Sequence, residues 1–344
     1  MKQLGKQTWQ FTSRPAIIGA SAVVGPEEGE GPLASDFDFV YDSLKMDEST
    51  WEKAERRLFE KAVRLALINS GLKQEQLGFF VGGDLMNQII SASFAAKKLG
   101  TPYLGVFGAC STSMESLTIA SMIVDSGGAK YALAGTASHN CTVEKQFRYP
   151  TEYGSQKPPT AQYTVTGSGC AIVGKNDGTQ TGPFITYATI GKIMDFDIKD
   201  PFNMGSAMAP AAADTITAHF RDTGLSPGYY DMIVTGDLAS VGLPIAQELL
   251  AKEGIPMEQT EFTDCGLLIY DRETQKYVIA GGSGCGCSAT VTYGHILKRM
   301  KKGQLKRVLV VATGALLSPL TYQQGESIPC IAHAVALESG GEQA

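Results

Sequence analysis

The chain lacks an apolar run long enough to cross a membrane. None of its hydrophobic stretches reaches the about 18 residues that a bilayer-spanning helix requires. The opening segment from Met1 to Ser13 is polar and has no hydrophobic region of the kind found in secretory signals. We therefore expect neither a transmembrane segment nor a signal peptide in these 344 residues.

The chain also has fewer basic than acidic residues, and few histidines. The chain has 29 Lys and Arg against 35 Asp and Glu, a net charge of −6, which does not favour a nucleic-acid partner. Only four histidines are present, and no two of them have the i, i+4 spacing of a helical metal-binding pair. We therefore expect neither a metal ion nor a cofactor.

Disulfide bonds are not expected either. The seven cysteines are an odd number and are scattered through apolar segments, which predicts a reducing compartment. Cys285-Gly286-Cys287 is spaced too closely for a usual zinc-binding pair, and no second pair accompanies it. We interpret these three residues as a tight turn.

Apolar residues and glycine are, in contrast, abundant. Hydrophobic residues make up 43% of the chain and there are 39 glycines, which suits a large core with many tight strand–helix turns. Residues 14–24 are typical of a strand, and residues 50–69 carry apolar side chains at helical spacing. The alternation of such segments predicts an α/β fold with mainly parallel sheets flanked by helices.

Two segments interrupt this alternation. Residues 138–164 are polar and contain proline, and we interpret them as a long functional loop or lid. Residues 266–282 are predicted to form a hairpin. The first segment is rich in aromatic and cationic residues, which suits a flat anion but equally a solvated loop; these residues are Phe147, Tyr149, Tyr153, Lys145, Arg148 and Lys157.

The chain contains the same half twice. Ser70-Gly71-Leu72 matches Thr223-Gly224-Leu225, and each is followed by an apolar run that ends in Gly-Asp-Leu, at residues 83–85 and 236–238. The spacing from the Gly to the Asp is the same in both copies, 84 − 71 = 13 and 237 − 224 = 13. A repeat with a fixed spacing indicates duplicated structure.

A second match supports the repeat. Cys110-Ser111 pairs with Cys287-Ser288, and each is followed by a helix-like stretch and an apolar strand that ends in a threonine, Thr136 or Thr313. The spacing agrees again, 136 − 110 = 26 and 313 − 287 = 26. We therefore predict two pseudo-symmetric βαβαβ halves, residues 1–195 and 196–344, with the site at their junction.

Cys110 stands where an apolar strand turns into a long predicted helix. The helix dipole and the unpaired N–H groups of a first helical turn favour a thiolate, so we expect a lowered pKa for this thiol. The same N–H groups can bind a carboxylate or an oxyanion. A buried packing cysteine explains the position equally well.

These segments resemble the thiolase and ketoacyl-ACP synthase superfamily over essentially the whole chain. Gly108-Ala109-Cys110-Ser111 with the following helix resembles the nucleophile segment, and residues 166–171 resemble the Gly-rich turn that follows it. The resemblance implies a thiolase-like α/β fold of five layers, αβαβα. It also implies a dimer formed through the strand before the nucleophile, Tyr103 to Phe107.

The resemblance does not extend to the residues that catalysis requires. Ser283 stands at the position of the thiolase histidine, Thr313 lies in the segment that carries the second cysteine, and Asp237 lies where a further histidine segment falls. Serine and threonine cannot shuttle protons near neutral pH, so Claisen chemistry lacks its base. We therefore predict a non-catalytic relative, not an enzyme, whose pocket binds a ligand.

The candidate ligand-binding residues are those that this likeness brings to the pocket. His139 follows the strand after the Cys110 helix, and such strand ends face the pocket in this architecture. The alternative is a loop histidine bonded to the backbone. The other three histidines are predicted to be structural. The candidate set is Cys110, Ser111, His139, Asn140, Asp237, Ser283 and Thr313; no residue is assigned a catalytic or metal-binding role.

Residues 107–117 resemble most closely the stage V sporulation protein AD (SpoVAD) family. The resemblance implies the soluble component of the SpoVA system, which binds dipicolinic acid or its calcium chelate and moves it into the forming spore and out at germination. It further implies membrane-embedded SpoVA partners and a peripheral position at the spore inner membrane. A thiolate at Cys110 would repel this dianion, so binding should favour the neutral thiol.

Two alternatives remain open on the residues alone. The first is an active acyltransferase that uses Cys110 as nucleophile and His139 as base. The second is a scaffold for the membrane partners, with a vestigial pocket that binds no small molecule.

Overall fold

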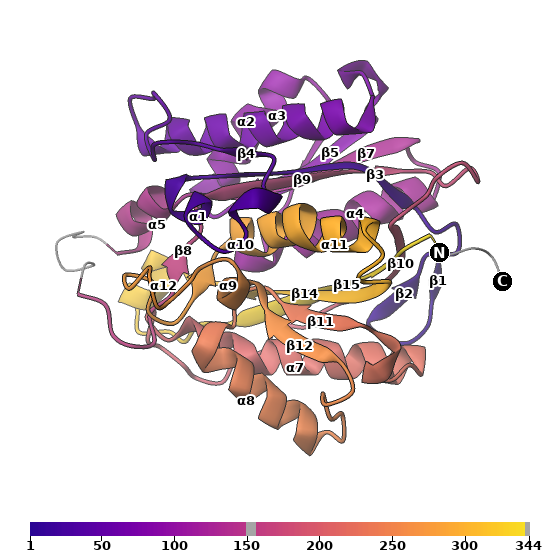
Figure 1. Cartoon of the computed structure of the whole chain (residues 1–344). Helices are drawn as coiled ribbons and strands as arrows, with labels where there is room; N and C mark the ends of the chain where they lie inside the picture. The colour runs from indigo at the N-terminus through magenta and orange to yellow at the C-terminus, as the bar shows by residue number, and fades with distance from the viewer. Residues whose placement is uncertain (149–155, 341–344) are drawn as a thin grey trace.

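Five layers of alternating helices and sheet make up the protein. The computed structural model describes residues 1–148 and 156–340. In Figure 1 one outer helical layer lies at the top, a helical layer runs through the middle and a second outer layer lies at the bottom, with strands between them. The thiolase-like αβαβα prediction is thereby confirmed. The outer helices are α2 (Trp51–Ser70), α3 (Ile90–Leu99), α7 (Met204–Thr223) and α8 (Ala239–Lys252), and the middle ones are α4 (Thr112–Asp125), α10 (Cys285–Thr290) and α11 (Leu297–Lys301).

The strands form one hydrogen-bonded path that reads almost symmetrically from its centre. Its order is β12-β11-β14-β15-β10-β3-β9-β7-β5-β6. The two strand layers meet at β3 and β10, which share a single pairing, Phe184 with Ala16. The strands on this path are β3 (Ala16–Val24), β5 (Phe79–Asp84), β6 (Tyr103–Gly105), β7 (Tyr131–Ser138), β9 (Gly167–Gly174), β10 (Phe184–Ile190), β11 (Met232–Thr235), β12 (Glu261–Asp264), β14 (Arg307–Ala315) and β15 (Cys330–Glu338).

Parallel pairing is confined to the outer parts of this path. β5 pairs in parallel with β6 and β7, and β11 pairs in parallel with β12 and β14. The central strands pair antiparallel, as in β7 with β9, β9 with β3, and β14 with β15. The expectation of mainly parallel sheets was therefore wrong, because β9 and β15 each run antiparallel to both of their neighbours.

The first repeat match marks equivalent helix ends. Thr50 caps the start of α2, where its side chain accepts a hydrogen bond from the backbone N–H of Lys53, and Gly71 caps its end with φ of 69°. α7 ends in the same way at Gly224, with φ of 72°. Glycine lacks a Cβ and adopts this left-handed conformation without strain, so it ends both helices at the same point of the repeat.

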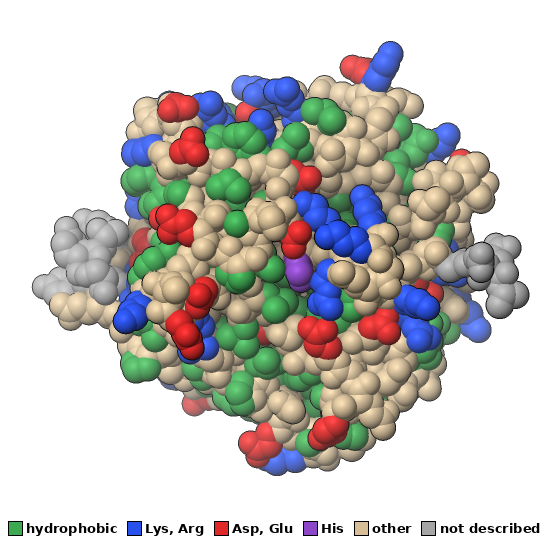
Figure 2. All heavy atoms as spheres, in the orientation of Figure 1, with side chains coloured by type: hydrophobic (Ala, Val, Ile, Leu, Met, Phe, Trp, Pro, Cys, Tyr) green, Lys and Arg blue, Asp and Glu red, His purple; other side chains and the backbone are tan. Residues whose placement is uncertain are grey.

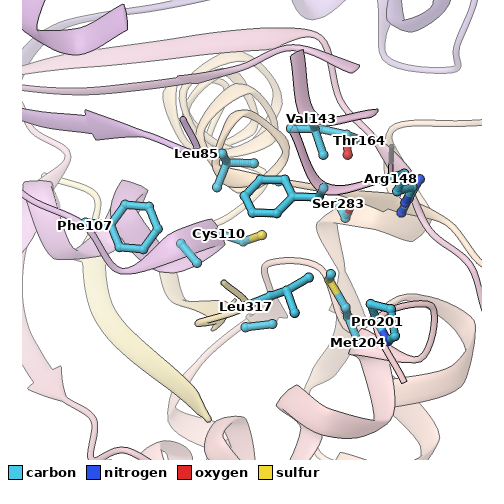
Figure 3. A pocket seen from close by; sticks show the side chains of 14 residues that line it. Leu85, Phe107, Cys110, Val143, Arg148, Thr164, Pro201, Met204, Ser283 and Leu317 are labelled. Atoms are coloured by element: carbon cyan, nitrogen blue, oxygen red, sulfur yellow. The ribbon is translucent and has the colours of Figure 1, made fainter. Parts of the chain in front are cut away.

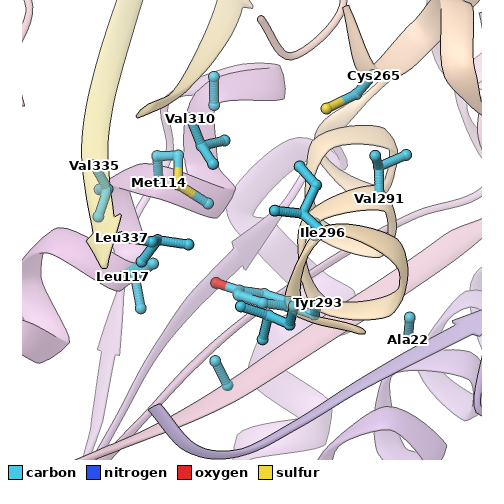
Figure 4. Packing of buried hydrophobic residues seen from close by; sticks show 14 of the residues in the cluster. Ala22, Met114, Leu117, Cys265, Val291, Tyr293, Ile296, Val310, Val335 and Leu337 are labelled. Atoms are coloured by element: carbon cyan, nitrogen blue, oxygen red, sulfur yellow. The ribbon is translucent and has the colours of Figure 1, made fainter. Parts of the chain in front are cut away.

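The middle helical layer is buried between the two strand layers. Met114 and Leu117 of α4 pack with Tyr293 and Ile296, which continue the α10 helix, and with Val335 of β15 (Figure 4). These side chains are almost completely removed from water. The layer joins the two halves, because α4 comes from the first and α10 from the second.

Close packing explains the glycine-rich segment at residues 166–171. A Cβ at Gly169 would lie 2.7 Å from Cβ of Ala289, and one at Gly167 would lie 2.8 Å from Cγ2 of Thr290. These glycines belong to strand β9 and let helix α10 approach it. The expected Gly-rich turn is therefore a strand, and Cys285 begins helix α10 where the sequence indicated a tight turn.

Two further segments differ from expectation. The predicted loop at residues 138–164 contains helix α5 (Asn140–Phe147) and the short strand β8 (Tyr163–Thr164). Tyr149 and Tyr153 lie outside the described residues. The predicted hairpin at residues 266–282 is absent, since α9 (Cys265–Leu268) begins there and β13 (Gly282–Ser283) pairs in parallel with β8. Asp264 caps α9 through the N–H of Gly266, which starts a helix instead of a strand.

The remaining elements lie at the edges and in the connections. They are β1 (Lys2–Gln3), β2 (Thr8–Gln10), β4 (Phe39–Val40), α1 (Pro26–Gly29) and α12 (Pro319–Gln323).

Acidic, basic and apolar side chains are interspersed on the face seen in Figure 2. Across the described residues, none of the helices combines the length and apolar character needed to cross a membrane. The division into halves at residue 195 stays a prediction.

Candidate functional site

A mostly apolar pocket lies where the two halves meet. It encloses about 580 Å³ of space between atoms, counted up to its open mouth. Both halves contribute to its wall, and Figure 3 shows Cys110 between Phe107 at one end and Arg148 at the other. The wall is formed by Leu85, Phe107, Ala109, Cys110, Val143, Phe147, Arg148, Thr164, Pro201, Met204, Ser283, Gly284, Ala315 and Leu317.

Cys110 lies in a 3-10 turn that directly precedes the central helix α4. The turn spans Ala109–Ser111, and α4 begins only at Thr112. Ala109 adopts a left-handed φ of 51°, which strains a residue with a Cβ. The Thr112 hydroxyl accepts from the N–H of Gly108 at 3.1 Å and donates to the carbonyl of Ala109 at 2.7 Å, so it holds the turn on both sides.

The turn rests on strand β14 of the other half. A Cβ at Gly314 would lie 2.1 Å from the carbonyl oxygen of Gly108 and 3.1 Å from the backbone nitrogen of Ser111. Only glycine allows the strand and the turn to approach so closely. The position of Cys110 is therefore set by contact between the halves as well as by its own helix.

The thiol of Cys110 is neutral, contrary to the prediction from its place in the chain. Its side chain is 8% exposed. Burial raises its pKa well above the ordinary value for a thiol, and the charge and hydrogen bonding of Asp237 and the neighbouring Cys285 raise it further. The N–H of Gly284 favours the thiolate but does not reverse these effects. The expected lowered pKa was wrong, because desolvation and a carboxylate outweigh the helix dipole.

Asp237 is the polar centre beneath Cys110. It accepts hydrogen bonds from the hydroxyl of Thr313 at 2.6 Å and from the N–H of Gly284 at 3.1 Å. Burial raises the pKa of Asp237 to about 7, while hydrogen bonds from Thr313 and Cys110 lower it in part. Thr313 and Asp237 were both predicted site residues, and the structure joins them to Cys110 as a buried cluster behind the pocket wall.

Of the other predicted site residues, one lines the pocket and the others lie outside its wall. Ser283 lines the pocket together with Cys110. Ser111 lies outside the wall, with its hydroxyl donating to the carbonyl of Gly108 at 2.7 Å. Asn140 is also outside it, where its backbone N–H donates to the hydroxyl of Thr166 at 3.1 Å. Their contact with a ligand stays a prediction.

His139 does not reach the pocket wall. Its Nε2 lies 2.9 Å from the carbonyl oxygen of Leu44, and its Nδ1 accepts from the N–H of Cys141 at 3.1 Å. Burial lowers the pKa of His139 to about 4, so the ring is neutral near pH 7. It therefore caps helix α5 as a buried structural residue, the alternative already open on the sequence.

Sequence reasoning missed most of the apolar wall. Leu85, Pro201, Met204 and Leu317 were not among the predicted site residues, yet all four line the pocket. Leu85 follows β5, Leu317 follows β14, and Pro201 and Met204 lie just before and at the start of α7, so only the fold brings them together. Arg148 had been noted as one of several cations near aromatics, and it is a wall residue.

Removing the charge of Asp237 should make Cys110 more reactive. In Asp237→Asn the thiol loses its carboxylate neighbour, so its pKa should fall while burial still holds it above the ordinary value. We expect alkylation of Cys110 by iodoacetamide near pH 8 to accelerate roughly tenfold for each unit of pKa. Peptide mass spectrometry across pH measures this, with half-exposed Cys141 as the internal reference. An unchanged profile would show that Asp237 does not control the thiol.

The five-layer fold and a cysteine in the turn before the central helix define a thiolase-like protein. Solved structures of OleA from Xanthomonas campestris share this fold. One matches with a TM-score of 0.60 and 14% identity over 97% of this chain and 100% of the OleA chain. A cerulenin-bound OleA structure matches with a TM-score of 0.61 and 16% identity, over 98% and 99% of the two chains.

Within this class, the chain belongs to the stage V sporulation protein AD (SpoVAD) family. The model of that family matches residues 5–338. Stage V sporulation protein AD of Bacillus subtilis (strain 168) is 52% identical over 341 residues, which cover 99% of each chain. The family resemblance read from residues 107–117 is thereby confirmed, and it supports a role in sporulation.

Proposed function

We propose that this protein binds dipicolinic acid, or its calcium chelate, in the pocket at Cys110. It would act as the soluble component of the SpoVA system that moves this compound into the forming spore and out at germination. Membership of the SpoVAD family supports the sporulation role. The ligand is a flat aromatic dicarboxylate, and the pocket offers mostly apolar walls with few polar groups.

The burial of Cys110 in the pocket wall, beside Asp237 and without a histidine among the wall residues, is the observation that carries this proposal. A nucleophilic enzyme would need a thiolate or a base beside the thiol, whereas a pocket for a dianion benefits from an uncharged floor. Burial and Asp237 hold the pKa of Cys110 high. The thiol can therefore meet the ring or a carboxylate of dipicolinate without repelling it.

We propose further that the pocket does not catalyse acyl transfer. No histidine is among its wall residues. The resemblance to thiolases places Ser283, which lines the wall, where those enzymes carry a histidine. The acyltransferase alternative relied on His139 as base, and the contacts of that ring with Leu44 and Cys141 give it no support. Absence of covalent acyl-Cys110 after incubation with acyl-CoA thioesters would agree with this proposal.

The partners and location follow from the same family role. We propose membrane-embedded SpoVA proteins as partners, a peripheral position at the spore inner membrane, and a homodimer formed through the strand at Tyr103 to Phe107. In support of the dimer, Leu104 and Phe107 are 43% and 47% exposed although both are large and apolar. β6 also stands at the end of the strand path, where its outer edge can pair with another strand.

Calorimetric titration with dipicolinate, with and without calcium, tests the ligand. We expect saturable 1:1 binding by the natural protein and weaker binding by Cys110→Ala, because the thiol forms part of the wall. Cys141→Ala is the matched control, since Cys141 lies outside the wall and should leave the affinity unchanged. Absence of binding under every calcium condition would instead favour the scaffold with a vestigial pocket.

Dipicolinate affinity is also expected to fall as pH rises through about 7. Burial raises the pKa of Asp237 to about 7, so this carboxyl is mostly protonated below that pH and charged above it. A charged Asp237 beneath Cys110 repels a dianion, and the bound dianion in turn favours the protonated acid. Titrations from pH 6 to pH 8 measure the slope, and Asp237→Asn should flatten it. A slope that survives in this variant would assign it to another group.

A further inference from the structure

We infer that Arg148 recognises a ligand carboxylate at its end of the pocket, with the charge of Lys157 behind the wall in support, and that Glu144 is a built-in counter-ion with which the ligand competes. This inference rests on the proposed function and adds a specificity determinant to it. Arg148 belongs to the pocket wall and lies at the opposite end from Phe107 (Figure 3). Among the wall residues that the structure describes, it is the one with a cationic side chain.

Arg148 and Lys157 share a single carboxylate. Nη1 of Arg148 contacts Oε1 of Glu144, one helical turn earlier on α5. Nζ of Lys157 lies 2.9 Å from the same oxygen. Two positive charges therefore face one negative charge, and within the described residues this cluster carries one positive charge in excess.

The cluster is largely removed from water. The side chains of Arg148, Lys157 and Glu144 are 9%, 16% and 17% exposed. Ion pairs at such depth are screened less by solvent than surface pairs are, so the excess charge acts strongly on an anion that enters the pocket. A neutral ligand of the same shape would gain nothing from it.

Aromatic neighbours hold both cations in place. The guanidinium of Arg148 lies 5.4 Å from the centre of the Phe202 ring, and Nζ of Lys157 lies 5.4 Å from the centre of the Tyr163 ring. Nη2 of Arg148 also donates to the carbonyl oxygen of Gln162 at 3.4 Å. A guanidinium fixed in this way can bind a planar carboxylate through two parallel hydrogen bonds.

Glu144 lies outside the pocket wall, but it already pairs with the guanidinium of Arg148 that a ligand carboxylate would use. Its carboxylate is the same chemical group as that of an aromatic dicarboxylate, and it already satisfies Arg148 and Lys157. A ligand must therefore share or displace it. The pocket accordingly discriminates against weak anions, because only a ligand that offers further contacts along the apolar wall can overcome this internal competitor.

Three variants and two probes test the inference by calorimetry. The probes are dipicolinate and its neutral analogue pyridine-2,6-dicarboxamide. Glu144→Gln removes the competitor and should bind dipicolinate about tenfold more tightly, whereas Arg148→Gln should bind it about tenfold more weakly. Glu52→Gln is the matched control and changes the net charge by the same amount. Glu52 of α2 pairs with Lys145 of α5, and neither residue lines the pocket. Thermal unfolding confirms that each variant is folded.

The outcomes separate this inference from the proposed function. If the natural protein binds dipicolinate but Glu144→Gln and Arg148→Gln bind it equally well, the inference is overturned and the proposed function stands. If only Glu144→Gln binds, the competition is supported directly. If neither the natural protein nor Glu144→Gln binds dipicolinate, both fail. An equal gain for the neutral dicarboxamide would also overturn the inference, because relief of charge competition cannot help an uncharged ligand.

Discussion

Replacing Asp264 with alanine is expected to lower the free energy of unfolding by about 3 to 5 kcal/mol. The buried carboxylate of Asp264 accepts backbone hydrogen bonds from Leu238 at 2.8 Å, Gly266 at 2.9 Å and Ala239 at 3.0 Å. It also accepts from the hydroxyl of Thr235 at 2.6 Å. Alanine would leave these donors buried without a partner. One isolated loss of this kind costs about 1 to 3 kcal/mol, and losses within one network do not add in full.

The strain at Ala239 adds to this expectation. Ala239 has a left-handed φ of 54° and begins helix α8, so the turn depends on Asp264 to hold it. Urea unfolding followed by circular dichroism measures the change. Asp271→Ala is the matched control, because Asp271 is only partly buried and its carboxylate accepts from the N–H of Glu273 at 2.9 Å. Equal stability of the two variants would contradict the role assigned to Asp264.

Replacing Gly314 with alanine is expected to destabilise the protein by about 1 to 3 kcal/mol and to disturb the pocket. The new Cβ would lie 2.1 Å from the carbonyl oxygen of Gly108, which is backbone and cannot rotate away. The turn that carries Cys110 must therefore move away from β14. Since Cys110 lies in the pocket wall, we expect dipicolinate binding to fall about tenfold or more.

Gly303→Ala supplies the control for this substitution. Gly303 has a φ of 71°, and no atom lies within 4 Å of the position of its Cβ. This variant should pay only the cost of the left-handed conformation, about 1 kcal/mol, and should keep its dipicolinate affinity. Paired unfolding and titration experiments separate the two effects. A Gly314→Ala protein with natural affinity would show that the contact with β14 does not position Cys110.

The sequence was sufficient to predict the duplicated architecture. Its periodic apolar segments and the repeated helix ends at Gly71 and Gly224 depend on local physics, namely burial of one helix face and a left-handed terminal residue. The segment from Phe107 to Leu117 carried the family resemblance. These sequence features depend on the local helix or strand and not on how the elements pack, so they can be recognised before the fold is known.

The candidate site was predicted only in part. Cys110 and Ser283 line the pocket, whereas His139 binds the backbone outside its wall. A position at a strand end identifies which end of the sheet a residue occupies, but not the direction of its side chain. Asp237 was placed near the site by alignment alone, and its bond with Thr313 became visible only once β14 packed beside β11.

The sequence by itself determined the repeat, many of the helices and strands that form each half, and the family. Only the tertiary structure decided how equivalent residues differ. Asp84 binds the N–H groups of Met86 and Ala92 in its own turn, whereas its repeat partner Asp237 faces Cys110 and Thr313. In the second half, Asp264 binds the turn instead and frees Asp237 for this role.

The same holds for the two repeat cysteines. Cys287 donates to the carbonyl oxygen of Gly236 in the core, while Cys110 faces the pocket beside Asp237. Their local sequences match, yet burial and charged neighbours from the opposite half set their surroundings. Hydrogen-bond partners and desolvation depend on distances across the junction of the halves. These distances, and not the place of Cys110 at the start of a helix, give this protein a neutral thiol at its pocket.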